Sequence, residues 1–213
     1  MRFSWPEPPR VYGILDTGYV KRDQWQKKCQ QLIDGGADII QLRAKGTSRD
    51  ERRILLEEIL PLFQSTATPL VLNDDWQLAA EYPGVGVHVG QDDAPVSEVR
   101  NALGDERILG LSTHSPDQAA KAIAQAHRLN YFAVGPVFAT PTKPTYVPVG
   151  LELVRHVAGL HPPLPWFCIG GIKRSNAQQV ISDGAQALVA VSDLLLDSDT
   201  AQATRSLRAA FDK

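Results

Sequence analysis

The sequence has little cysteine and no long apolar run. Cys29 and Cys168 are its only cysteines, and no metal-ligand spacing relates them, so we expect two reduced thiols, as in a cytosolic protein. No apolar run approaches the roughly 20 residues that a membrane span needs. The first residues also lack the apolar stretch of a signal peptide. These absences predict a soluble, cytoplasmic protein.

The sequence also lacks an excess of charge of one sign. Its 22 Lys and Arg residues stand against 24 Asp and Glu residues, which gives a formal net charge of -2. Such a balance disfavours wholesale binding of nucleic acid or of an anionic membrane. Any site for an anion must therefore be local. The sequence allows a homo-oligomer without specifying one.

A glycine-rich turn after the first expected strand is missing as well. The residues at 16–19, Asp-Thr-Gly-Tyr, do not match the dinucleotide fingerprint of an open doubly wound sheet. Instead, short runs rich in Val, Ile and Leu alternate with helix-like stretches, as in the βα units of a parallel sheet. These runs predict eight strands, at residues 11–17, 39–45, 69–73, 86–91, 108–112, 131–138, 166–170 and 187–192.

Eight βα units in 213 residues with 43% hydrophobic content favour closure of the sheet. We therefore predict an α/β fold, a (β/α)8 TIM barrel that forms a single domain over residues 1–213, with residues 1–10 as an N-terminal extension. One helix start is marked in detail, because Ser48 and Glu51 have the spacing of a capping box ahead of an apolar helical pattern.

Polar residues gather after the expected strands, where the chemistry of such barrels takes place. Gln41, Arg43 and Lys45 are two residues apart, so in a strand their side chains leave the same side. Charges at strand ends are also common on solvated surfaces, and for these three residues alone that interpretation stays open. With Lys143 arriving from another loop, they instead fit an anion with many acceptor oxygens, such as pyrophosphate.

Two carboxylates, Asp74 and Asp93, follow neighbouring strands. Each stands just before a helical stretch, so either one alone fits a helix cap. Together they fit Mg²⁺, which takes one or two carboxylates plus phosphate oxygens of a substrate. Asp75 and Asp92 stand beside them, and the sequence does not rank the four.

The loops after the last two strands have a different character. Gly170 and Gly171 allow a ligand to approach the backbone, and loops in this position are a frequent phosphate seat in barrels. Two histidines are less specific. His88 alternates with valines and indicates a structural role, whereas His114 is open between core packing and proton transfer.

Taken together, these residues resemble a known family. The motifs run in order over almost the whole chain: Gln41-Leu-Arg43-Ala-Lys45, Asn73-Asp74, Gly86-Val-His88-Val-Gly90-Gln91-Asp-Asp93, Gly110-Leu-Ser112, Gly135-Pro-Val-Phe-Ala-Thr140-Pro-Thr142-Lys143, Gly170-Gly171-Ile and Val191-Ser192. The chain resembles the thiamine phosphate synthase family. The resemblance implies a barrel transferase of thiamine biosynthesis that joins a pyrimidine methyl pyrophosphate to a thiazole phosphate, with Mg²⁺ as cofactor.

The resemblance also assigns roles to residues. The pyrimidine pyrophosphate would be bound by Gln41, Leu42, Arg43, Ala44, Lys45, Asn73, Ser112 and Lys143. The thiazole phosphate would be bound by Thr140, Pro141, Thr142, Gly171, Val191 and Ser192, and Mg²⁺ by Asp74 and Asp93. The catalytic residues would be Arg43, Lys45, Ser112 and Lys143. In the family, loss of pyrophosphate creates a pyrimidine carbocation that the thiazole nitrogen captures, so the protein stabilises charge and orients two rings.

The chain departs from the family pattern in two places. Ala44 stands where many members carry an acidic residue, and Val191 where isoleucine is frequent. Strand alternation points Ala44 away from the basic residues on either side of it, so we expect little effect on the chemistry.

Two other functions are considered. A thiazole tautomerase shares the fold and the thiazole phosphate seat but transfers a proton without Mg²⁺, with His114 as the acid-base group. A catalytically silent barrel would bind a phosphorylated metabolite and regulate a partner. Neither needs the acidic and basic residues, yet Arg43, Lys45, Asp74 and Asp93 are all present. The synthase is therefore favoured.

Overall fold

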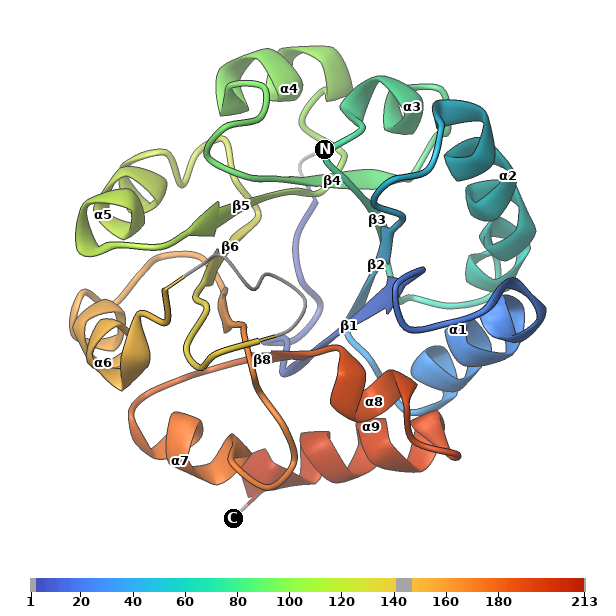
Figure 1. Ribbon diagram of the computed structural model, residues 1–213. Helices are drawn as coiled ribbons and strands as arrows, with labels where there is room; N and C mark the ends of the chain where they lie inside the picture. The colour runs from blue at the N-terminus through green and yellow to red at the C-terminus, as the bar shows by residue number, and fades with distance from the viewer. Residues whose placement is uncertain (1–2, 141–146, 213) are drawn as a thin grey trace.

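The computed structural model describes residues 3–140 and 147–212 of the chain. Its parallel strands close into a barrel in sequence order, and the helices lie around the outside (Figure 1). The strands are β1 Val11–Asp16, β2 Ile39–Arg43, β3 Leu70–Asn73, β4 Gly86–Val89, β5 Leu109–Thr113, β6 Tyr131–Val134, β7 Trp166–Cys168 and β8 Leu188–Ala190. The predicted (β/α)8 TIM barrel and its eight strands are confirmed.

Helices follow the strands along the chain. The α-helices are α1 Trp25–Asp34, α2 Arg49–Ile59, α3 Trp76–Ala80, α4 Val96–Leu103, α5 Pro116–Ala124, α6 Gly150–Gly159, α7 Ala177–Ser182, α8 Ser192–Leu195 and α9 Thr200–Arg208. Short 3-10 helices are η1 Arg22–Gln24, η2 Leu60–Phe63 and η3 Ala209–Asp212. The capping box predicted for α2 is confirmed, because Ser48 Oγ accepts from Glu51 N at 3.2 Å and the Glu51 carboxylate accepts from Ser48 N at 2.7 Å. In the described part of the chain, no helix is long and apolar enough to cross a membrane.

Alternate side chains of the strands enter two apolar layers, as the period of two requires. Leu15, Leu42 and Leu72 face outward and pack in the layer between barrel and helices. Tyr12 and Tyr131 face inward, where they form a buried cluster with other residues of the barrel interior. This inner cluster supports the residues that emerge at the carboxyl ends of the strands.

The N-terminal extension packs against the inner cluster. The ring centroid of Trp5 lies 6.4 Å from that of Tyr131 and 6.3 Å from that of Phe167. Trp5 Nε1 also donates to the carbonyl oxygen of Asn130 at 3.2 Å. Residues ahead of β1 therefore contribute to the packing of the barrel interior.

Strand β2 ends at Arg43, two residues before the predicted end. The hydroxyl of Thr47 donates to the carbonyl of Ala44 at 2.8 Å and closes a turn that leads into α2. Lys45 therefore lies in a turn beyond the strand, and the expectation that it shares a strand face with Gln41 and Arg43 is wrong.

Gly110 in β5 gives the first prediction. A Cβ atom at this position would lie 2.1 Å from Cζ of Tyr131, so Gly110→Ala must displace a buried ring. We expect a loss of about 1–3 kcal/mol in the free energy of unfolding. The control is Gly159→Ala in α6, where no atom lies within 4 Å of the added Cβ, and where a gain of about 0.4–1 kcal/mol is expected. Urea unfolding measures both, and equal changes in the two variants would contradict the prediction.

Candidate active site

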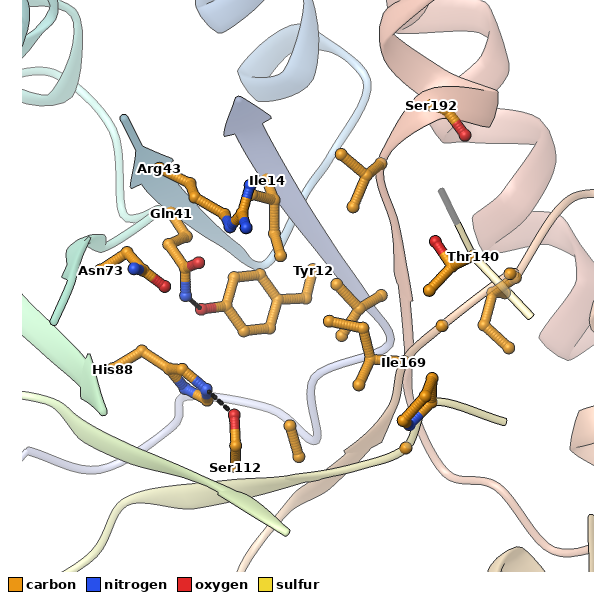
Figure 2. A pocket seen from close by; sticks show the side chains of 18 of the residues that line it. Tyr12, Ile14, Gln41, Arg43, Asn73, His88, Ser112, Thr140, Ile169 and Ser192 are labelled. Carbon is orange, nitrogen blue, oxygen red and sulfur yellow. Dashed lines mark hydrogen bonds between the residues drawn. The ribbon is translucent and has the colours of Figure 1, made fainter. Parts of the chain in front are cut away.

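A cavity opens at the carboxyl ends of the strands (Figure 2). Many of its lining residues were predicted from the sequence: Gln41, Arg43, Asn73, Ser112, Thr140, Gly171, Val191 and Ser192. They come from segments that are far apart in the sequence and meet only because the barrel closes. We call this space the central cavity.

A second, more polar cleft adjoins the central cavity. Lys45 and Asp74 line this cleft together with Ala44, Arg49 and Asp75, and we call it the acidic-basic cleft. Asn73 lines both spaces, so the two adjoin at the end of β3. Leu42 packs its side chain in the outer apolar layer instead, which leaves its main chain for any contact with a ligand.

Three of the predicted site residues, Pro141, Thr142 and Lys143, lie outside the described residues. Thr140, which precedes them, lines the central cavity.

Arg43 is held by a carboxylate that sequence reasoning missed. Its Nη1 lies 2.5 Å from Oδ2 of Asp16, and the side chains of the two residues are 13% and 2% exposed. The other carboxylate oxygen of Asp16 accepts from Gly18 N at 2.8 Å. Asp16 is the register partner of Arg43 across β1 and β2. The sequence contains a signal for this ion pair, because the last residue of one strand is acidic and the last residue of the next is basic.

Asp74 of the second cleft interacts with Lys45 and with Asp93, which lies beside the cleft and does not line it. Lys45 donates to the Asp74 carboxylate in a close ion pair. Asp93 accepts from Gly90 N at 2.7 Å, and its carboxyl group lies within hydrogen-bonding reach of Asp74. Partial burial of this carboxyl group raises the pKa of Asp93, and the neighbouring Asp74 charge raises it further, against the opposing effects of the Gly90 amide and Lys45.

The helix-cap interpretation of Asp74 and Asp93 does not hold in the described chain. Helix α3 is capped by Asp75, whose Oδ1 accepts from Leu78 N at 3.1 Å. Helix α4 follows Pro95 and has no side-chain cap. Within residues 3–140 and 147–212 no three His, Cys, Asp or Glu side chains group as a metal site, so Asp74 and Asp93 stand as a pair. Two carboxylates in contact repel when both are ionised, and a cation beside them relieves that repulsion.

The loop after β7 approaches the start of α8 on the other side of the central cavity. Gly171 has φ of +64°, and a Cβ there would lie 2.7 Å from Cβ of Phe138, so this close approach requires glycine. Asn176 fixes the loop from both sides, because its Nδ2 donates to Gly171 O at 2.9 Å and its Oδ1 accepts from Lys173 N at 2.8 Å. Arg174 donates from its main chain and side chain to the Asp193 carboxylate at 3.0 and 2.9 Å, which ties the loop to α8.

His114 also lines the central cavity. Its Nδ1 lies 2.5 Å from the carbonyl oxygen of Gly135, so this nitrogen carries a hydrogen and donates it. Its main-chain N donates to Gln118 Oε1 at 2.7 Å. The first contact fixes the ring, and the second fixes the main chain of the same residue.

The fold and the site together define a class of protein: a (β/α)8 barrel whose strand ends bring cations, paired carboxylates and a glycine loop around two adjoining spaces. A family described as thiamine monophosphate synthase, TMP-TENI, matches residues 11–194. The chain belongs to this family, and its relatives are enzymes of the transferase class.

Individual relatives agree. A thiamine-phosphate synthase of Arthrobacter sp. (strain FB24) is 42% identical over 199 residues, covering 84% of each chain. A thiamine-phosphate synthase of Shouchella clausii (strain KSM-K16) is 35% identical over 208 residues, covering 97% of this chain and 98% of the relative. A solved structure of thiamine phosphate pyrophosphorylase from Pyrococcus furiosus superimposes with a TM-score of 0.75 at 24% identity and covers 95% of both chains, which supports the fold.

Proposed function

We propose that the protein is a thiamine phosphate synthase that joins a pyrimidine methyl pyrophosphate to a thiazole phosphate. The observation that carries the proposal is the pair of adjoining spaces, both of which Asn73 lines. The central cavity suits a ring. The acidic-basic cleft suits a polyanion held by cations and a metal. A molecule that carries an aromatic ring and a pyrophosphate spans both.

The reaction needs little acid-base chemistry. The bond between the methylene carbon of the pyrimidine and the pyrophosphate oxygen breaks, and the electron pair leaves with the pyrophosphate. The lone pair of the thiazole nitrogen then forms a bond to the methylene cation. Arg43 and Lys45, with Lys143 as a third cation, stabilise the charge that develops on the leaving group. Ser112 orients the pyrimidine.

Asp74 of the acidic-basic cleft and the neighbouring Asp93 fit Mg²⁺. Asp74 and Asp93 would hold the ion, since their carboxylate oxygens are the ligands that Mg²⁺ prefers and two carboxylates leave positions for substrate oxygens and water. When bound, the ion supplies positive charge to the departing pyrophosphate. Lys45 pairs with the Asp74 carboxylate and holds it at the cleft.

The thiazole phosphate would bind across the central cavity from Arg43. Thr140, Gly171, Val191 and Ser192 line that side, with Pro141 and Thr142 as further expected contacts. A phosphate there would lie beside main-chain N–H groups of the loop after β7, which Asn176 shapes, and of the start of α8, to which Arg174 ties that loop. The thiazole ring then faces the pyrimidine across the cavity.

The test is a product assay on the purified protein. With both substrates and Mg²⁺, pyrophosphate and thiamine phosphate should appear in equal amounts, and neither should appear when Mg²⁺ or one substrate is left out. Protein that is folded by circular dichroism and releases no pyrophosphate would remove the proposal. Turnover of the thiazole phosphate alone would instead favour the tautomerase.

Asn176 provides a prediction about the phosphate seat. Asn176→Ala removes both hydrogen bonds that shape the loop from Gly171 to Lys173. We expect the KM for the thiazole phosphate to rise about tenfold, equivalent to one lost hydrogen bond, while the KM for the pyrimidine pyrophosphate stays within twofold. The matched control is Arg155→Ala, which removes an exposed ion pair with Asp183 and should leave both constants unchanged. Equal rises in both KM values would contradict a role confined to this seat.

A further inference from the structure

A chain of hydrogen bonds crosses the barrel interior below the central cavity. Gln41 Nε2 lies 2.5 Å from Tyr12 Oη, which lies 2.9 Å from Tyr131 Oη. Tyr131 Oη lies 3.0 Å from His88 Nδ1, and His88 Nε2 lies 2.9 Å from Ser112 Oγ. Figure 2 shows the two ends of this chain, Gln41 on Tyr12 and His88 on Ser112, pointing toward the same space. We call it the interior relay.

The interior relay has a direction, because each hydroxyl has one hydrogen. An amide nitrogen only donates, so Tyr12 accepts from Gln41. Among the described residues, Tyr131 Oη is then the remaining acceptor within reach for the buried Tyr12 hydrogen, which assigns Tyr12 as the donor of that contact. Tyr131 then gives its hydrogen to His88 Nδ1, which must be the unprotonated nitrogen. His88 Nε2 carries the hydrogen and donates it to Ser112 Oγ.

This direction determines what the two ends offer to a ligand. Ser112 Oγ already accepts from His88, so the Ser112 hydrogen is left to donate into the central cavity. Gln41 uses Nε2 on Tyr12, so Oε1 is the group it offers as an acceptor. The two ends of the interior relay thus present one acceptor and one donor to the cavity, at fixed positions on β2 and β5.

We propose that Tyr12, Tyr131 and His88 are positioning residues, which fix the Gln41 amide and the Ser112 hydroxyl so that the cavity selects a ring with an exocyclic amine beside a ring nitrogen. The amine donates to Gln41 Oε1, and the ring nitrogen accepts from Ser112 Oγ. The oxo counterpart of such a ring, with a carbonyl beside a ring N–H, presents the opposite pattern. This inference rests on the proposed function for the identity of the ring.

The surroundings hold the interior relay rigidly. Tyr12 and Tyr131 are 1% and 0% exposed, and their rings pack edge to face with centroids 5.6 Å apart. The Tyr131 ring occupies the space that a side chain at position 110 would fill. The His88 ring stacks on Tyr131 with centroids 5.5 Å apart. Burial raises the pKa of both phenols, so each keeps the hydrogen that it donates.

Selection by this arrangement is expected to be strong. A ring with the opposite pattern places an acceptor against Gln41 Oε1 and a donor against the Ser112 hydrogen, and both protein groups lose their partner in a buried site. Sites that hydrogen-bond a substrate group reject analogues that lack it by large factors. We expect a preference of at least about 100-fold in kcat/KM for the amino over the oxo pyrimidine methyl pyrophosphate.

The first experiment determines the direction of the hydrogen bonds in the interior relay and needs no substrate. In ¹⁵N spectra of the histidine rings, the His88 signal, identified by its loss in His88→Asn, should report a neutral ring with hydrogen on Nε2. In Tyr131→Phe the donor to Nδ1 is gone, so a mixture of both tautomers is expected. A wild-type ring with hydrogen on Nδ1, or on both nitrogens, at neutral pH would overturn the proposal. The hydrogen bonds of the interior relay would then point in the opposite direction, or His88 would be unable to accept from Tyr131.

The second experiment measures selectivity. Tyr12→Phe frees the Gln41 amide to rotate, so the amino-to-oxo preference should fall about tenfold or more while the KM for the thiazole phosphate stays unchanged. The control is Tyr82→Phe, which removes a hydroxyl of similar chemistry outside the barrel, in the bend after α3, where it contacts Glu57 and Arg53 of α2. An unchanged preference in folded Tyr12→Phe would overturn the positioning role.

Failure of the proposed function would look different. Without any turnover by the wild type, calorimetric binding of the amino and oxo pyrimidine methyl phosphates still measures the preference, and the His88 tautomer is still observable. A wild type that forms thiamine phosphate but accepts both rings equally would contradict the positioning role and leave the proposed function standing.

Discussion

Replacing Arg43 with methionine is expected to lower the free energy of unfolding by about 3–5 kcal/mol, because the buried Asp16 carboxylate loses its cation. The same change should reduce turnover by about 10²–10³-fold, the usual cost of one lost electrostatic contact to a developing charge. Urea unfolding measures the first effect. Steady-state release of pyrophosphate at saturating substrates measures the second.

A double variant separates the two effects. Asp16→Asn with Arg43→Met leaves a neutral amide whose oxygen still accepts from Gly18 N, so most of the lost stability should return. Turnover should not return, because the cation that faces the pyrophosphate is still missing. A double variant as unstable as Arg43→Met would show that the unpaired carboxylate is not the cause of the loss.

Asp93→Asn is expected to abolish most turnover without harming the fold. The amide oxygen of the variant still accepts from Gly90 N. The substitution nevertheless removes one of the two negative charges proposed to hold Mg²⁺. We expect a loss of about 10²-fold or more in kcat. Added Mg²⁺ should raise the melting temperature of the wild type, by linkage of binding to folding, and should not raise that of Asp93→Asn.

The pH dependence of this variant follows from the raised pKa of Asp93. A carboxyl whose pKa is higher in the folded state binds its proton more tightly there, so its contribution to stability is present at low pH and is lost as the pH rises through the raised pKa. Without Mg²⁺, Asp93→Asn should therefore be at least as stable as the wild type at neutral pH, and the difference should vanish in acid. A variant that is less stable at neutral pH would show that Asp93 is a structural residue.

Much of the fold was accessible from the sequence because parallel strands in a barrel are apolar on both faces. Runs such as those around Val87 and Leu111 stand out between polar helices, and the strand count follows. Most predicted site residues were then found by one rule, that polar residues after such runs meet at one end of the barrel. Gln41 and Ser192 line the same cavity for that reason.

What the sequence did not reveal depends on register and on local turns. In the sequence, Asp16 is an ordinary residue at the end of a strand. Its role becomes visible only when β1 pairs with β2 and the register places it opposite Arg43. Lys45 has strand-like spacing, yet the hydroxyl of Thr47 turns the chain two residues earlier. Tyr12 and Tyr131 look like core residues of two unrelated strands, and their hydroxyl contact exists only because the barrel closes.

Trp5 links the start of the chain to the chemistry at the opposite end of the barrel. It rests on Tyr131, the middle member of the interior relay. The segment that contains Phe3 and Trp5 thus forms part of the floor of the inner cluster. Trimming it, or fusing a bulky tag directly ahead of Phe3, alters that floor, so a purification tag is better attached behind η3, on the outside of the barrel (Figure 1).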